Sequence, residues 1–462
     1  SRADTVGVFQ IESRAQMNML PRLKPRTFYD LVIEVAIIRP GPIQGGMIHP
    51  YLRRRQGLEP VSYPSPAIEE ALSRTLGVPI FQEQVMQLAV VAAGFTPGEA
   101  DQMRRSMAAW RQRGTMEKFQ HKLTAGLLNK GYTPEFAEQI YRQIEGFSGY
   151  GFPESHAASF ALLVYISSWL KCHHPAAFLC GLLNSQPMGF YAPAQLIADA
   201  RTHGVDIRPA DVSVSDWDCV LEATPHGAAP GVRLGLRMVK GTEQDAVRRI
   251  VAARAQAPVS TVDALTRRAR LDRRQLACLA SGGALRSLAG HRHQAHWQAP
   301  ARRPDALLRD APVNEAALAL AAPREGEDIV ADYASLGFTL GRHPLALLRS
   351  QLAAQRFITA AELRRLPDRA LARAAGIVTC RQRPGTASGV MFVTVEDETG
   401  LANIIVHKDL QERQRSEVLG ATLLGIYGQV SREGEVIHLI ARRLVDRSPL
   451  LGALAPRSRD FH

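Results

Sequence analysis

Long apolar stretches and an N-terminal targeting segment are both missing from this 462-residue sequence. Crossing a bilayer takes roughly 20 consecutive apolar residues, and the longest apolar stretch, 157–170, is interrupted by Ser159, Ser167 and Ser168. The chain opens with Ser-Arg-Ala-Asp instead of Met, and no signal peptide follows. We therefore expect no membrane contact and a cytoplasmic location, and we expect the N-terminus to have been cut from a longer polypeptide.

Several chemical signatures are missing as well. The five cysteines form no Cys-x-x-Cys pair, which argues against a disulfide framework and a zinc ribbon and favours a reducing compartment. There is no Gly-x-x-x-x-Gly-Lys-Ser/Thr loop, no His-Glu-x-x-His and no Gly-x-Ser-x-Gly. We also find no convincing pair of carboxylates for two-metal phosphoryl transfer. The chain by itself is therefore expected to bind no metal.

What the sequence has in surplus is positive charge. Lys and Arg number 56 against 44 Asp and Glu, which gives a formal net charge of +12. Fifteen Lys or Arg and only four acids lie between Arg233 and Arg303, so almost the whole surplus sits in one short segment. A solvated basic face is one explanation. The concentration in one small domain favours a protein that binds the phosphate backbone of nucleic acid.

The basic segment also contains a repeated local pattern. A glycine turn at 235–242 leads into a helix-like stretch at 246–251, and a second glycine turn, 281–284, lies among leucines. Two helices joined by such a hairpin expose backbone N–H groups that can hold a phosphate. The pattern resembles a tandem helix-hairpin-helix module, and the second copy is favoured because Glu243 in the first would repel phosphate. The expected DNA-binding residues are Lys240, Arg248, Arg249, Arg273, Arg274, Gly282, Gly283, Arg286 and Arg292.

Capping signals and periodicity predict a helical N-terminal part. Thr96 and Glu99 have the spacing of a capping box, with Pro97 at the first helical position. A second helix is predicted over 133–146, where it ends at a glycine, and a third over 155–171.

From about Ala375 the pattern changes to five short strand-like runs separated by turns. Five strands in about 70 residues suit a small barrel of the oligonucleotide-binding (OB) type. The expected fold is multidomain and mainly α, with a helical first domain, a helix-hairpin-helix domain and a five-stranded OB-type β-barrel near the C-terminus. The expected domains are 1–195 (helical), 196–303 (helix-hairpin-helix), 304–345 (linker with some helix), 346–450 (OB fold) and 451–462 (C-terminal tail).

Two clusters near the N-terminus can present polar side chains. A Pro-Gly-Pro turn directly after Arg39 can orient Arg39 and Gln44 toward a ligand, or it can be a turn with a purely structural role. The second cluster, 81–86, begins an apolar helix, and its glutamines can be no more than a polar face.

Two further clusters carry charge and aromatic character. Arg104 and Arg105 are adjacent on a predicted helix, so they can bracket an anion or face solvent. The glycines of 149–156 allow a ligand to approach the backbone, and Tyr150 can stack on a base or sugar. His156 lies at the start of a helix, where an anion is favoured, although a capped core histidine is an equal alternative.

Five motifs follow one another within the first 156 residues: Val8-Phe9-Gln10-Ile11-Glu12-Ser13, Arg39-Pro40-Gly41-Pro42, Gln82-Glu83-Gln84-Val85-Met86, Arg104-Arg105, and Gly149-Tyr150-Gly151-Phe152 up to His156. Their order resembles the fingers region of a bacterial C-family DNA polymerase, the family of the alpha subunit of DNA polymerase III. The likeness continues through the helix-hairpin-helix domain and the barrel. The ending soon after the barrel resembles the error-prone, translesion branch of the family, so 1–195 would be polymerase fingers.

The resemblance implies that the full-length protein is an error-prone DNA-directed DNA polymerase, a nucleotidyltransferase acting in damage-induced translesion synthesis and DNA repair. Its palm domain, with the aspartates that hold Mg²⁺, would precede Ser1. The chain alone is therefore expected to be inactive, and it contains no expected catalytic residue. The resemblance implies six nucleotide-binding residues: Arg104 and Arg105 at the triphosphate of the dNTP, Tyr150 and His156 at the sugar and base, and Arg39 and Gln44 at the nascent pair or template.

The expected partners are primer–template DNA and dNTP. The segment 304–332 lacks the short peptide by which replicative members of the family hold the sliding clamp. By resemblance, the clamp would be reached through an accessory translesion protein, a catalytically inert relative of the Y-family polymerases. Two alternatives remain open, a non-catalytic DNA-binding or scaffold protein and a replicative alpha subunit.

Overall fold

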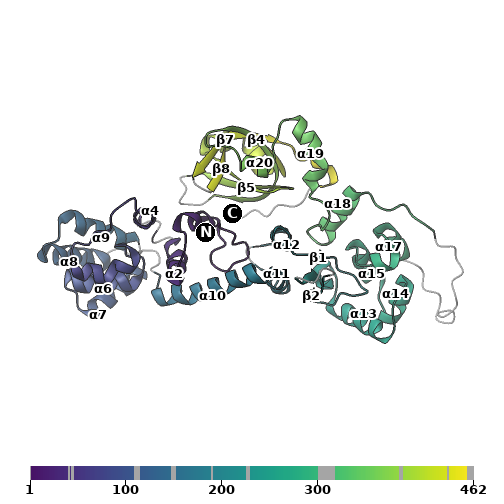
Figure 1. Ribbon diagram of the computed structural model, residues 1–462, viewed down its shortest axis with the longest axis horizontal. Helices are drawn as coiled ribbons and strands as arrows, with labels where there is room; N and C mark the ends of the chain where they lie inside the picture. Colours follow the sequence, from purple (N-terminus) through teal and green to yellow (C-terminus); the bar gives the residue numbers. More distant parts are fainter. Residues whose placement is uncertain are drawn as a thin grey trace. The chain divides into compact units, whose positions relative to one another are not determined.

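The chain forms two compact units, Ser1–His173 and His174–His462, in a computed structural model (Figure 1). The domain boundaries expected from the sequence stay predictions. The structure describes residues 2–39, 42, 46–108, 115–146, 152–188, 191–224, 229–299, 318–383, 389–433 and 436–454.

All the secondary-structure elements described in the first unit are helices. Ser13, Thr27 and Ser65 cap helices α1, α2 and α5 through their side-chain oxygens. The helices are α1 (Arg14–Leu23), α2 (Phe28–Ile37), α4 (Ile48–Arg55), α5 (Pro66–Leu72), η1 (Ser73–Thr75), α6 (Gln82–Ala93), α7 (Pro97–Ala108), α8 (Thr115–Asn129), α9 (Pro134–Gly146) and α10 (Glu154–His173).

The three helices predicted from caps and periodicity are confirmed as α7, α9 and α10. At the start of α7, the Glu99 carboxylate accepts from the Thr96 N–H at 2.9 Å, and the Thr96 hydroxyl accepts from the Glu99 N–H at 3.3 Å. Helix α2 packs along α10, and α6 packs against α5, α7 and α8. Gly126 allows α8 to approach α6 closely, since a Cβ there would lie 2.1 Å from the carbonyl oxygen of Ala93.

The second unit begins with two helices and a three-stranded sheet that the sequence did not predict. The sheet has the order β1-β3-β2, with β1 parallel and β2 antiparallel to β3. Five helices of the helix-hairpin-helix region follow. The elements are α11 (Pro175–Asn184), α12 (Pro193–Thr202), β1 (Ile207–Arg208), β2 (Val220–Glu222), β3 (Gly231–Arg233), η3 (Leu236–Met238), α13 (Gln244–Gln256), α14 (Val262–Ala269), α15 (Arg273–Ser281), α16 (Arg286–Ala289) and α17 (Arg292–Gln298).

A closed five-stranded barrel, with strand order β4-β5-β6-β8-β7, completes the second unit and confirms the expected fold class (Figure 1). Alternate residues of the strands fill its apolar interior. None of the described helices of the chain is both long enough and apolar enough to cross a membrane. The elements are α18 (Glu325–Ser335), α19 (Pro344–Ala354), α20 (Ala360–Leu363), β4 (Leu371–Gln382), β5 (Met391–Asp397), β6 (Gly400–Val406), α21 (Lys408–Arg413), α22 (Arg415–Gly420), β7 (Leu423–Glu433), β8 (Val436–Asp446) and η5 (Ser448–Leu454).

Candidate functional site

An array of aromatic rings lies at the start of α10. The ring centre of His156 is 5.1 Å from that of Phe152 and 4.2 Å from that of Phe160, and Phe160 makes an edge contact with Phe9 at 5.3 Å. The His156 side chain is nevertheless exposed on its helix. The imidazole is therefore held in one place by its neighbours while it stays accessible to a ligand.

Arg39 joins this array from the end of α2. Its guanidinium carbon lies 4.7 Å from the ring centre of Phe152, and its Nη2 donates to Oε1 of Gln10 at 2.7 Å. A planar guanidinium favours stacking on an aromatic face. The structure thus brings together Arg39 and His156, two of the predicted nucleotide-binding residues, because both contact Phe152.

Contacts with α6 and with Tyr29 fix the start of α10, next to the aromatic array. The backbone N–H of Gln82 donates to the Phe152 carbonyl at 3.3 Å, and the Glu83 carboxylate accepts from the Glu154 N–H at 2.9 Å. The Glu154 carboxylate accepts from the Tyr29 hydroxyl at 2.8 Å. The backbone of Gln82, a glutamine that the sequence suggested was no more than part of a polar face, and the carboxylate of Glu83 therefore position the first turn of α10.

Arg104 and Arg105 lie on α7 and share one carboxylate. Asp101 accepts from Nη2 of Arg104 at 2.8 Å and pairs with Nη2 of Arg105 at 2.7 Å. The hydrogen bond from Arg104 and the charges of both arginines hold the pKa of Asp101 below its ordinary value. Within the described ranges, neither arginine contacts the aromatic array, and the predicted residues Tyr150 and Gln44 lie outside the described residues.

Glu34, on α2, is a buried acid that sequence reasoning missed. Its side chain is 0% exposed, and neither carboxyl oxygen has a hydrogen-bond partner among the described residues. Burial raises its pKa to about 8. The only sequence signal is an acid inside the apolar run 31–37.

In the second unit, the first predicted hairpin meets the C-terminal end of α18. The backbone N–H of Lys240 donates to the carbonyl of Ser335 at 2.9 Å. The ammonium group of Lys240 donates to the carbonyls of Tyr333 and Ala334 at 3.3 and 2.9 Å. A cation at a helix C-terminus is favoured by the helix dipole. Lys240 therefore stabilises the end of α18.

The second hairpin is held by the acids of α18. Arg292 is 5% exposed, and its guanidinium pairs with Asp328 and, at 2.6 Å, with Asp332. Arg286, which is more exposed, pairs with the other oxygen of Asp328 at 3.1 Å. Both arginines were predicted from the sequence to bind DNA. In this structure they connect the hairpin to α18.

The two glycines of this hairpin have different environments. Gly282 is buried, and a Cβ there would lie 2.7 Å from a methyl carbon of Val239. Gly283 has a φ of +71°, which L-residues rarely adopt, and a Cβ there would lie 3.3 Å from Nη2 of Arg292. Close packing against the first hairpin therefore explains Gly282, and the positive φ explains Gly283.

Four predicted positions lie along α13 and α15. Arg249 donates to the carbonyl of Ala269 at 2.8 Å and so supports the turn before α15. Arg248 is exposed and pairs with Asp245 on its own helix. Arg273 and Arg274 are exposed, and neither has an ion pair or side-chain hydrogen bond within the described ranges. These last two arginines are the cations of the predicted set that the fold leaves unpaired.

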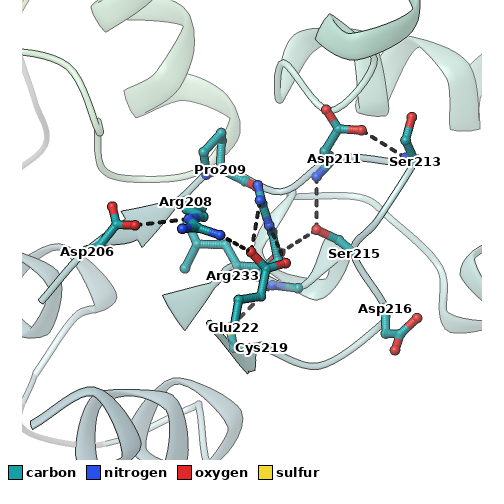
Figure 2. Close-up of polar contacts among 12 residues, drawn as sticks. Asp206, Arg208, Pro209, Asp211, Ser213, Ser215, Asp216, Cys219, Glu222 and Arg233 are labelled. Atoms are coloured by element: carbon teal, nitrogen blue, oxygen red, sulfur yellow. Dashed lines mark hydrogen bonds and ion pairs between the residues drawn. The ribbon is translucent and has the colours of Figure 1, made fainter. Parts of the chain in front are cut away.

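In the three-stranded sheet, two arginines are paired with one carboxylate. Glu222 accepts hydrogen bonds from Arg208 at 2.8 Å and from Arg233 at 2.9 and 3.0 Å. Figure 2 shows these contacts as dashed lines. The bond from Arg233 lowers the pKa of Glu222, with a smaller contribution from Arg208. Nearby, the Ser215 hydroxyl accepts a hydrogen bond from the Asp211 N–H (Figure 2) and donates one to the carbonyl of Leu234. Arg233, which opens the basic segment of the sequence, is therefore structural.

Comparison with known proteins identifies a domain within each unit. Residues 1–131 match the finger domain of the bacterial DNA polymerase III alpha subunit, and residues 204–295 match a helix-hairpin-helix motif. Across its whole length, the chain is 64% identical to the error-prone DNA polymerase of Aromatoleum aromaticum and 63% identical to that of Azoarcus sp., covering 45% and 44% of those proteins. The error-prone DNA polymerase of Pseudomonas fluorescens is 58% identical, with 45% of it covered.

The chain is thus similar over its whole length to part of error-prone DNA polymerases, and its residues 1–131 match the finger domain of the DNA polymerase III alpha subunit, as the order of its motifs predicts. The curated relatives that it matches are error-prone DNA polymerases, and the chain spans less than half of their length.

Proposed function

We propose that this chain supplies the nucleotide-binding fingers and the DNA-binding domains of an error-prone DNA polymerase that acts in translesion synthesis and DNA repair. The incoming dNTP binds to the first unit, and the primer–template is held by the second. The array of Arg39, Phe152 and His156 at the start of α10 is the observation that carries this proposal. It presents a guanidinium and an imidazole on one rigid aromatic support. A nucleotide has an anionic part, which a guanidinium can bind, and a planar part, which can stack on a ring.

Arg104 and Arg105 bind the triphosphate in this proposal. They lie within the matched finger domain; the Arg105 side chain is exposed and the Arg104 side chain is partly exposed. Asp101 holds them side by side in the absence of nucleotide. A triphosphate carries more negative charge than one carboxylate, so it displaces Asp101 and receives charge-assisted hydrogen bonds from both forks.

The Mg²⁺ ions of the polymerase reaction would be held by residues outside these 462. Asp101, Glu154 and Asp30 of the first unit do not fit a magnesium pair, because Asp101 and Glu154 accept from arginine and tyrosine side chains and Asp30 accepts from the N–H groups of Arg26 and Thr27. Mg²⁺ would neutralise charge on the triphosphate and orient its reacting phosphorus. The residues of this chain bind and orient the nucleotide.

The helix-hairpin-helix domain and the barrel hold DNA without reading its sequence, and Arg273 and Arg274 are the phosphate-binding groups that the fold leaves unpaired. Recruitment to the sliding clamp occurs through an accessory translesion protein, an inactive relative of the Y-family polymerases.

The test uses the full-length polymerase in primer extension with varied dNTP concentration. Arg104→Ala and Arg105→Ala should each lower kcat/KM for dNTP by at least about tenfold, because a charge-assisted contact made to the triphosphate is lost. Arg142→Ala is the matched control, since Arg142 is also exposed and paired with a glutamate on its own helix. Unchanged kcat/KM in both variants would refute the nucleotide-binding role. Absence of primer extension by the unsubstituted full-length protein would favour a non-catalytic DNA-binding protein.

A further inference from the structure

A row of arginine and tyrosine side chains crosses the outer face of the barrel. Arg373 on β4 and Arg443 on β8 are both register partners of Tyr427 on β7, so the three residues lie directly across adjacent strands. Their guanidinium carbons lie 5.1 and 5.5 Å from the centre of the Tyr427 ring. Sequence analysis missed this row, because its members are far apart in the chain and become neighbours only through strand pairing.

The strand alternation directs these side chains outward. The residues beside them in the strands, Ala372, Ala374, Ile426 and Leu444, belong to the buried barrel interior. Successive side chains of a strand point to opposite faces. Both arginines are accordingly exposed, and Tyr427 is half-buried between them.

The ring of Tyr427 is held in place by its packing against Phe357. Its ring makes an edge contact with the buried Phe357 at 5.6 Å. Phe357 lies over Gly425, where a Cβ would approach to 2.9 Å, so the missing side chain leaves room for the phenyl ring. The tyrosine therefore gives both guanidinium groups a fixed support.

The two arginines of the row have no carboxylate partner within the described ranges of the chain. Arg349, in the same unit, differs from them, because its charge is taken by ion pairs with Asp397 and Glu398. Stacking on a ring leaves the N–H donors of a guanidinium available to an anion. The row thus offers two preoriented cationic forks with unused donors.

We propose that the Arg373–Tyr427–Arg443 row binds the phosphate groups of a single DNA strand. This inference rests on the proposed function, because it assumes that the chain works on DNA.

Barrels of this type commonly bind oligonucleotides on their second and third strands, which are β5 and β6 here. The row lies on the first, fourth and fifth strands and so forms a separate surface. Its two guanidinium carbons are no more than about 11 Å apart, since both lie over one ring. Tyr427 acts as a positioning residue.

The test measures binding of a fluorescently labelled oligothymidine by the 462-residue chain, as fluorescence anisotropy at several salt concentrations. Arg273→Ala and Arg274→Ala are present throughout, so that the helix-hairpin-helix domain contributes less. Adding Arg373→Ala and Arg443→Ala should weaken binding at low salt at least about fivefold and reduce the salt slope by about 1.4, the value for two phosphate contacts on single strands. Tyr427→Ala should also weaken binding, whereas Tyr427→Phe, which keeps the ring, should retain it.

The control removes two other exposed arginines of the same barrel, through Arg413→Ala and Arg415→Ala, and should leave affinity unchanged within about twofold. Circular dichroism confirms that each variant is folded. The proposal is overturned if Arg373→Ala with Arg443→Ala has no more effect than this control, or if the parent chain binds no single strand. Primer extension by the full-length polymerase is a separate readout. If the polymerase extends primers normally while Arg373→Ala with Arg443→Ala does not weaken single-strand binding, only the proposal for the row is refuted, and the proposed polymerase function stands.

Discussion

Arg292 and Arg274 belong to the same helix-hairpin-helix region, yet their guanidinium groups have opposite surroundings. Arg292 is 5% exposed and pairs with Asp328 and Asp332 of α18. Arg274 is exposed at the start of α15 and has no ion pair among the described residues. The first arginine joins one part of the fold to another, and the second is available to an anion from outside.

This difference separates positive charge that stabilises the fold from positive charge that can bind DNA. Arg233, Arg249, Arg286 and Arg292 all contribute to the basic count of the segment, and all have partners in the folded chain. Net charge therefore overstates the number of phosphates that this domain can contact. The unpaired arginines give a better count.

The largest effect is expected from Arg292→Ala. The substitution leaves the partly buried Asp332 without its cation and leaves Asp328 with Arg286 alone, and breaking a buried ion pair costs several kcal/mol. Since both carboxylates keep some solvent exposure, we expect the free energy of unfolding to fall by roughly 3 kcal/mol.

Denaturant unfolding of the chain measures this loss. Arg286→Ala is the control, because Arg286 is more than half exposed and shares Asp328. It should cost about 1 kcal/mol or less. Equal losses for the two variants would contradict the distinction between a buried and an exposed contact to α18.

Glu34 in the first unit sharpens the comparison, since it is a buried acid whose carboxyl oxygens have no hydrogen-bond partner among the described residues. Its pKa is raised to about 8 in the folded chain by burial, against an ordinary value of 4.5. The stability that the neutral carboxyl provides is fully present below about pH 4.5 and is lost as pH rises to about 8. We expect a decline on the order of 3 kcal/mol across this range.

Glu34→Gln should remove that decline, because an amide does not titrate in this range. Thermal unfolding of both chains between pH 5 and pH 8 tests this. Parallel pH profiles for the two chains would show that Glu34 is ionised in the folded state.

Gly282→Ala should have an intermediate effect. A Cβ at this position would lie 2.7 and 2.9 Å from the methyl carbons of Val239, so the hairpins would have to separate slightly. Such overpacking costs about 1–3 kcal/mol. Gly181→Ala on α11 is the control, since a Cβ there meets nothing within 4 Å. A stabilised Gly282→Ala variant would mean that the hairpin has room that the structure does not show.

Sequence reasoning was most successful where local signals decide the structure. The capping box at Thr96 and Glu99 and the five strand-like runs gave helix α7 and the barrel correctly. The short strands of the first sheet have only two or three residues each, too few for a periodic signal. Their existence depends on pairing between distant segments.

The candidate site was only partly predictable for the same reason. Arg39 and His156 were singled out from their motifs, and the structure brings both onto Phe152. The role of Arg292 could not be found, because the acids that hold it lie on α18, inside a segment interpreted as a linker. A sequence identifies an arginine but does not identify its partner.

The smallest effect on stability, together with a clear effect on DNA binding, is expected from Arg273→Ala combined with Arg274→Ala. Both side chains are exposed and lack partners among the described residues, so the free energy of unfolding should change by less than about 0.5 kcal/mol. Each arginine that contacts a phosphate of duplex DNA contributes about −0.9 to the slope of log K against log[salt]. The double substitution should therefore make the slope about 2 units shallower. Arg248→Ala is the matched control, because Arg248 is equally exposed but already paired with Asp245, so its loss should change the slope by less than one unit. Titrations of a labelled duplex at several salt concentrations measure all three slopes. If the double variant keeps the slope of the unsubstituted chain, then duplex binding depends on other cations, and unpaired arginines are no better guide to DNA binding than total charge.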